Sequence, residues 1–166
     1  MRYLITKDGI SPRPIPGTKR GEHIANSDEH EEYGYSDEAS KVRIQQMDKR
    51  MKKLEEIQKE IPLPKVYGPK NASKTLVCWG SSFGTCKDSI EQMKNVNMIH
   101  FEYIYPTPKN LDKFLKKFKK LILVEQNKTG QLGKLIRQET GIEIKDKILK
   151  YDSRPFWSDE LVKEMK

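Results

Sequence analysis

The sequence predicts an α/β protein with a mostly parallel sheet, preceded by an extended arm and a long helix. From about residue 74 onward, candidate strands and helices alternate at the spacing of βαβ units. The clearest unit is a short apolar run, Leu121 to Glu125, followed by a glycine-containing turn and an amphipathic helix that stops at Gly141. Because open α/β sheets bind at the carboxyl ends of their strands, the polar residues after this run mark a candidate functional edge.

Composition places the core in the second half of the chain. Of 166 residues, 35% are apolar and 34% charged, and the apolar runs lie after residue 74. The net charge of +8 suggests an acidic partner, although a lysine-rich solvated surface gives the same value. No run is long enough for a membrane span, and the first residues lack the apolar segment of a signal peptide. Two cysteines make no disulfide framework, so we expect a reducing, cytoplasmic compartment.

Three segments are expected: an arm over 1–36, a helix and linker over 37–73, and an α/β domain over 74–166. Prolines in the arm favour extended chain. The helix carries a narrow apolar stripe on an otherwise charged surface, and it is expected to lie on a domain or a partner chain. The stripe consists of Met47, Met51, Leu54, Ile57 and Ile61.

The α/β part contains four recognisable strands. They are expected over 75–79, 97–103, 121–125 and 147–151. Helices are expected from Thr85, over 109–118, before Gly141 and from Ser158. In the 109–118 helix, four apolar residues at helical spacing face the core and lysines occupy the outer face.

Gly80 to Gly84 reads GSSFG, which has the form of a nucleophile elbow centred on Ser82. A hydrolase would also need an acid and then a histidine downstream. The only later histidine, His100, falls inside a predicted strand, so a tight turn that lets a helix dock on a strand is the better interpretation. Backbone N–H groups at this turn also make an anion site conceivable.

Other chemistry is less well supported. His23 and His30 lie in a stretch that we expect to be a solvated acidic turn rather than a metal site. Cys78 and Cys86 have no CxxC spacing for zinc or an iron–sulfur cluster. Nucleic-acid binding is not expected, because no aromatic residues are interleaved with the basic ones. The basic cluster comprises Lys113, Lys116, Lys117 and Lys120.

Glu125, Asn127 and Gln131 form the most informative polar set. One interpretation is local, with Asn127 and Thr129 satisfying the backbone at the turn and the helix start. Another is an interdomain or subunit contact, and catalysis is a third. No catalytic constellation accompanies these residues.

Six segments in a fixed order carry a family resemblance. They are DGISPRPIPG (8–17), SDEHEEYGYSDEASKVRIQQMDKRMKK (27–53), VCWGSSFG (77–84), YPTP (105–108), VEQNKTGQL (124–132) and KYDSRPF (150–156). Together they resemble the C-terminal part of the alpha subunit of 2-oxoacid:ferredoxin oxidoreductases of the 2-oxoglutarate synthase type. Ser153 stands where that family usually has glycine.

The resemblance implies a transketolase C-terminal-like domain, a three-layer α/β/α fold with a five-stranded, mostly parallel sheet, so one strand remains unassigned. It implies that the larger domain of the alpha chain that helps bind thiamine diphosphate is missing here, as are the thiamine motif of the beta subunit and cluster cysteines. No cofactor is therefore expected in this chain; thiamine diphosphate, magnesium and an iron–sulfur cluster are expected in the complete complex.

The resulting hypothesis is an assembly role within a complex that converts a 2-oxoacid to its coenzyme A thioester and reduces ferredoxin. The expected partners are the other alpha-chain domain, the beta subunit and, indirectly, ferredoxin. Glu125, Asn127, Gln131 and Arg154 would mark the contact edge. The alternatives are a freestanding basic adaptor acting through Lys113 to Lys120, and a small anion-binding module at the Gly80–Gly84 turn.

Overall fold

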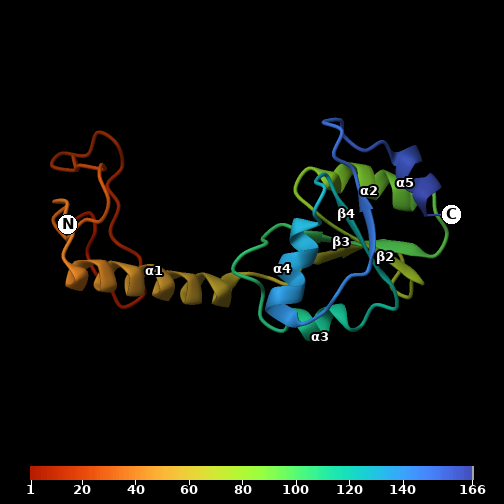
Figure 1. Cartoon of the computed structure of the whole chain (residues 1–166), viewed down its shortest axis with the longest axis horizontal. Helices are drawn as coiled ribbons and strands as arrows, with labels where there is room; N and C mark the ends of the chain where they lie inside the picture. The colour runs from red at the N-terminus through yellow and green to blue at the C-terminus, as the bar shows by residue number, and fades with distance from the viewer. Residues whose placement is uncertain (166) are drawn as a thin grey trace. The chain divides into compact units, whose positions relative to one another are not determined.

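The computed structural model describes residues 1–165, which divide into two compact units, Met1–Glu60 and the chain from Ile61 onward (Figure 1). The arm and the long helix, which the sequence presents as separate segments, belong to one unit. The second unit starts before residue 74, because it includes a strand within the expected linker.

The second unit is built on a five-stranded sheet in the order β1-β3-β2-β4-β5. Its strands are β1 (Lys65–Tyr67), β2 (Lys74–Trp79), β3 (Val96–Phe101), β4 (Leu121–Glu125) and β5 (Asp146–Leu149). All neighbours pair in parallel except β1, which runs antiparallel to β3. The unassigned fifth strand is therefore β1. It is a three-residue edge strand with mostly exposed side chains, and so short a strand leaves no pattern in the sequence.

Helices cover both faces of this sheet. Helices α2 (Ser82–Glu91) and α5 (Ser158–Glu164) cover one face, and α3 (Leu111–Leu115) and α4 (Gln131–Thr140) cover the other. Successive residues of a strand point to opposite faces, so alternate residues of β2 enter two separate cores.

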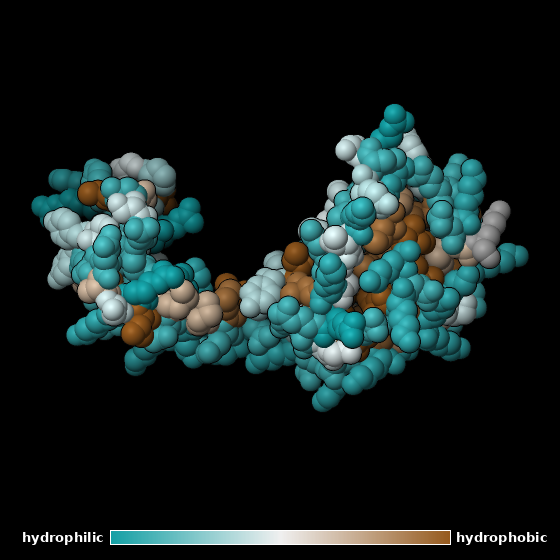
Figure 2. All heavy atoms as spheres, in the orientation of Figure 1, coloured by the Kyte–Doolittle hydropathy of each residue, from teal (hydrophilic) through white to brown (hydrophobic). Residues whose placement is uncertain are grey.

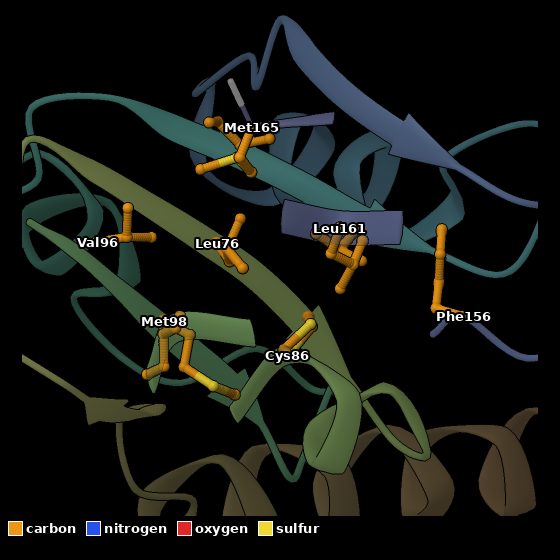
Figure 3. Close-up of a cluster of buried hydrophobic side chains, with 11 residues drawn as sticks. Leu76, Cys86, Val96, Met98, Phe156, Leu161 and Met165 are labelled. Carbon is orange, nitrogen blue, oxygen red and sulfur yellow. The ribbon is translucent and has the colours of Figure 1, made fainter. Parts of the chain in front are cut away.

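Leu76 and Cys78 of β2 pack with Cys86 of α2 and Leu161 of α5, whereas Val77 packs with the helices of the opposite face. Figure 3 shows the first of these clusters, with side chains gathered from β2, α2 and α5. The predicted three-layer α/β/α fold with a mostly parallel sheet is confirmed.

Two helix boundaries differ from the expectation. Helix α2 begins at Ser82 rather than Thr85, because the GSSFG turn itself supplies the first helical residues. Helix α3 is only five residues long, and the chain beyond it continues through turns. The apolar spacing over 109–118 still marks the buried face, since Phe114 and Phe118 stack edge to face with ring centroids 5.3 Å apart.

The first unit consists of helix α1 (Ser40–Glu60) and an arm that folds against the polar side of that helix. Lys49 Nζ donates to the Tyr3 carbonyl oxygen at 2.8 Å and to Ser11 Oγ at 3.0 Å, and Gln46 Nε2 donates to the same carbonyl at 3.1 Å. Gly9 (φ +74°) lies so close to α1 that a Cβ there would be 2.4 Å from the Lys49 carbonyl oxygen. The arm thus docks by backbone approach and polar bonds.

Glu29 joins the arm to two arginines of α1. Its carboxylate accepts from Arg50 at 2.7 Å and from Arg43 at 3.0 Å, and only 8% of the residue is exposed. The hydrogen bond from Arg50, reinforced by charge, lowers the pKa of Glu29 to about 2. His30 is buried too and stacks on Tyr3. The expectation of a solvated acidic turn is therefore wrong here, because carboxylates with arginine partners can be buried.

The first unit contains no buried apolar side chain among residues 1–60. Large apolar side chains are instead visible on its surface among the hydrophilic ones (Figure 2). In the part of the chain that the structure describes, no helix has the length and hydrophobicity required to cross a membrane.

Candidate functional site

The sheet has a topological switch point at the carboxyl ends of β2 and β4. The chain leaves β2 for β3 on one side, and then returns to place β4 on the other side of β2. Such a reversal opens a crevice in which α/β proteins commonly bind ligands. Here it forms a hollow of about 210 Å³, lined by Trp79, Gly80, Ser81, Ser82, Gln126 and Asn127.

Glu125 lies beneath this edge at the end of β4 and has no exposed surface. Its carboxylate accepts from Asn127 Nδ2, from Trp79 Nε1 at 3.4 Å and from the Gly133 N–H at 3.2 Å. The last of these bonds comes from the first turn of α4. A buried carboxylate is tolerated when several donors surround it, so Glu125 joins β2, β4 and α4.

Asn127 completes the connection between β4 and α4. Its Oδ1 accepts from the backbone N–H groups of Thr129, Gly130 and Gln131 at 3.1, 2.7 and 3.3 Å. Gly130 adopts φ +62° within this turn. The local interpretation of the polar set is confirmed for Asn127, which satisfies the N–H groups at the turn and helix start that would otherwise lack acceptors. It is wrong for Thr129, which takes part only by donating its own N–H to Asn127.

The four predicted contact residues do not have equal access to a partner. Gln131 and Arg154 are exposed and Asn127 is half-buried, whereas Glu125 is completely covered by its own chain. Glu125 therefore cannot contact a partner directly. It instead supports the edge by joining β2, β4 and α4. Contact through Asn127, Gln131 and Arg154 stays a prediction.

The segment after β5 completes the same edge. Gln126 Nε2 donates to the Arg154 carbonyl oxygen at 3.3 Å, which links the ends of β4 and β5. Ser153 adopts φ +65°, a conformation that glycine takes more readily.

Two aromatic residues of this segment are exposed, and neither belongs to the four contact residues predicted from the sequence. Tyr151 is 63% and Trp157 is 68% exposed, while the neighbouring Phe156 is buried in the core. Lys128 Nζ lies 5.7 Å from the centre of the Tyr151 ring. Large aromatic residues are typical of protein interfaces, but a sequence gives no direct sign of which ones are left uncovered.

The structure does not assemble the other candidate chemistry. His100 Nε2 lies 3.3 Å from the Gly80 carbonyl oxygen, and Ser82 has no hydrogen bond to it among the described residues. Within residues 1–165 no three His, Cys, Asp or Glu side chains gather as metal ligands. Cys78 and Cys86 are fully buried, and their mutual contact and burial raise the pKa of the Cys78 thiol. The described residues thus offer no fit for a metal or an iron–sulfur cluster.

The basic cluster is partly neutralised within the chain. Lys116 Nζ lies 3.4 Å from Asp112 Oδ2, and Lys120 Nζ lies 3.4 Å from Asp146 Oδ2. These exposed pairs contribute little to stability, but they reduce the charge that a polyanion would meet.

Fold and edge together define an α/β/α domain with an appended arm–helix unit. No family model matches the chain. It is 39% identical to the "2-oxoacid:ferredoxin oxidoreductase subunit alpha" of Saccharolobus solfataricus, covering 99% of this chain and 27% of the relative. It is 37% identical to "2-oxoacid:ferredoxin oxidoreductase 1, subunit alpha" of Sulfurisphaera tokodaii, with 96% of this chain and 26% of that one covered.

A solved structure agrees with these relatives. The 2-oxoglutarate:ferredoxin oxidoreductase from Magnetococcus marinus, with 2-oxoglutarate, coenzyme A and succinyl-CoA bound, superposes with a TM-score of 0.77 at 28% identity. The match covers 98% of this chain and 29% of that chain. The chain belongs to the family of 2-oxoacid:ferredoxin oxidoreductase alpha subunits, as the resemblance predicted, and it spans about a quarter of the length of the curated relatives it matches.

Proposed function

We propose that this chain is the C-terminal assembly portion of the alpha chain in a 2-oxoacid:ferredoxin oxidoreductase. The complete enzyme would oxidatively decarboxylate a 2-oxoacid, for example 2-oxoglutarate, to its coenzyme A thioester and reduce ferredoxin. The chain itself would bind other parts of the enzyme and carry out no chemical step. The names of its relatives support the reaction class, and the surface of the first unit supports the assembly role.

The observation that carries the proposal is the set of exposed apolar side chains on the first unit. Its residues 1–60 bury no apolar side chain, yet nine of its large apolar side chains are exposed. These are Met1, Ile5, Ile10, Ile15, Ile24, Tyr33, Tyr35, Ile44 and Met51. A unit that exposes these side chains and buries no apolar side chain of its own is suited to gain apolar burial from a partner.

Helix α1 presents part of this surface. The arm bonds to this helix through residues that include Gln46 and Lys49, and it leaves some apolar side chains of the helix exposed. Within the stripe Met51 is 47% exposed, and Ile44 beside it is 60% exposed. The proposed occupant is the rest of the oxidoreductase, because the matching relatives have nearly three-quarters of their length outside the region that this chain matches.

A second contact would form at the carboxyl edge of the sheet. Asn127, Gln131 and Arg154 would meet a neighbouring domain or the beta subunit, while Glu125 would hold that edge in place. The exposed Tyr151 and Trp157 add apolar area to the same contact.

The cofactors would lie in the other parts of the complex. Thiamine diphosphate, magnesium and an iron–sulfur cluster would be held by the other alpha-chain domain and the beta subunit, and ferredoxin would meet this chain only indirectly. We propose a cytoplasmic location for the assembled enzyme.

Co-purification with the remaining alpha-chain domain and the beta subunit tests the proposal. The chain alone should not reduce a dye with 2-oxoglutarate, coenzyme A and thiamine diphosphate, and the assembled complex should do so. Ile44→Asp should weaken assembly at least tenfold. Gln45→Asp, which adds the same charge at the adjacent exposed position, should leave assembly nearly unchanged. Turnover by the isolated chain, or its recovery from the native host as a solitary monomer, would overturn the proposal.

The alternative function is a freestanding basic adaptor, and one experiment distinguishes it from the assembly role. Replacing Lys113, Lys116 and Lys117 by glutamate should abolish salt-dependent binding to nucleic acid, if that binding exists, but leave assembly with the oxidoreductase subunits intact.

A further inference from the structure

The N-terminus of α2 has backbone donors without acceptors. Ser81, the residue before the helix, makes no capping hydrogen bond with its side chain. The Phe83 N–H bonds to the Gly80 carbonyl oxygen at 3.3 Å, whereas the N–H groups of Ser82 and Gly84 have no acceptor among the described residues. A helix of ten residues with an uncapped N-terminus concentrates partial positive charge at this end.

Ser82 supplies a second and independent observation. Its residue surface is only 6% exposed, and its hydroxyl has no hydrogen-bond partner within residues 1–165. Ser82 nevertheless lines the 210 Å³ hollow at the switch point. The Ser82 hydroxyl is not among the fully enclosed polar atoms that lack a partner, so it is accessible from the hollow and available to a bound group.

The lining of the hollow favours an oxyanion over a cation. None of its six lining residues is acidic, and the Asn127 side chain is already committed to Glu125 and the turn. The nearest carboxylate, Glu125, is fully buried and accepts three hydrogen bonds. Gly80 and Gly84 leave the approach open, because a Cβ at either position would meet no atom within 4 Å.

We propose that the hollow is a binding site for a small oxyanion, a phosphate or a carboxylate. The ligand would accept from the Ser82 hydroxyl and from the N–H groups of Ser82 and Gly84 at the α2 N-terminus. The site shares Asn127 with the second contact proposed above, but it lies outside the exposed apolar side chains of the first unit. Anion binding is measured on this chain alone, so either proposal can fail without the other.

Titration of the full ¹⁵N-labelled chain, followed by NMR, tests the site. Inorganic phosphate in one arm and acetate in the other, each at constant ionic strength held with NaCl, identify which oxyanion binds. The amides of Ser82 and Gly84 should shift together and saturate with at least one of the two. Saturation only with phosphate would assign a phosphate site, and saturation only with acetate would assign a carboxylate site.

Two variants and one control link binding to the named groups. Ser82→Ala should weaken binding about five- to tenfold, the value of one hydrogen bond. Gly84→Pro removes one N–H group in the first turn of α2, where proline is tolerated. This variant should weaken anion binding by about the same factor as Ser82→Ala. Ser153→Ala, at an exposed serine that does not line the hollow, should change the affinity less than twofold. Absence of saturation with both anions, or equal losses in Ser153→Ala and Ser82→Ala, would overturn the proposal.

Discussion

All the buried apolar side chains of residues 1–165 lie in the unit that starts at Ile61, while the unit Met1–Glu60 has polar groups in their place. In the second unit, two apolar clusters flank the sheet, with Leu76 on one side and Val77 on the other. In the first unit, the buried positions are occupied by residues such as Glu29 and Lys49.

This difference indicates which unit is built to fold by itself. Burial of apolar surface is the main favourable term in folding, and a small unit that lacks it depends on other contacts. Burial lowers the pKa of Lys49, so the arm–helix contact bears a cost of desolvation. The second unit therefore resembles an independent domain, and the first resembles an interface element that gains its apolar burial from a partner.

The largest expected change in the free energy of unfolding distinguishes the second unit from the first. Leu76→Ala, at a fully buried position, should lower the free energy of unfolding by about 2–5 kcal/mol. Ile15→Ala, at a position 78% exposed, should change it by less than about 0.5 kcal/mol but should weaken assembly. Tryptophan fluorescence in urea measures the first effect, because both tryptophans lie in the second unit. Comparable losses of stability in both variants would contradict the view that only the second unit is stabilised by apolar burial.

The next effect tests the polar connection inside the second unit. Glu125→Gln places an amide among three donors and should lower the free energy of unfolding by about 1–3 kcal/mol. Glu143→Gln, at an exposed position, is the control and should cost less than about 1 kcal/mol. Urea unfolding of both variants provides the measurement, and a stable Glu125→Gln protein would mean that the carboxylate does not hold the edge.

The docking of the arm should depend on the absence of a side chain at Gly9. Gly9→Ala would bring a Cβ within 2.6 Å of the Lys53 nitrogen and should detach the arm, at a cost of about 1–3 kcal/mol. The rate of tryptic cleavage in the arm should rise about tenfold, while unfolding of the second unit stays unchanged. Gly17→Ala has a similarly positive φ but meets no atom within 4 Å, so its effect should be smaller. Equal cleavage rates in the two variants would contradict the close approach.

Low pH should loosen the first unit before the second. The pKa of Glu29 is lowered from 4.5 to about 2 in the folded chain, so its contribution to stability is complete above about pH 4.5 and is lost as the pH falls toward 2. NMR signals of the arm should therefore change over this range. Glu29→Gln should abolish that change, while the exposed control Glu55→Gln should retain it. An arm that is unaltered at pH 2.5 would argue against the Glu29–arginine contact as its main support.

The smallest expected effect lies at the edge after β5. Ser153→Gly should raise the free energy of unfolding by up to about 1 kcal/mol, because glycine adopts φ +65° without strain. Ser153→Ala retains the strain and should leave stability nearly unchanged. Thermal unfolding of the two variants measures the difference, and no gain with glycine would show that the turn is unstrained.

Sequence patterns predicted the second unit better than the first. Repeated apolar spacing identified four strands, the core faces of the helices and the turn around Asn127, because local periodicity reflects burial on a regular element. Strand β1 has three residues and no such periodicity, so only its pairing with β3 defines it. The burial of Glu29 and His30 was likewise not predicted, since Glu29 depends on arginines of α1 and His30 stacks on Tyr3, all of them distant in the chain.

The sequence by itself determined the class of fold, the family and the place where polar residues gather after β4, because these follow from short-range patterns. Only the tertiary structure decided which of those residues face solvent: it buried Glu125, exposed Trp157 and left the Ser82 hydroxyl without a partner beside a hollow. Exposure is a property of what packs on a residue from elsewhere in the chain, and no local pattern contains that information.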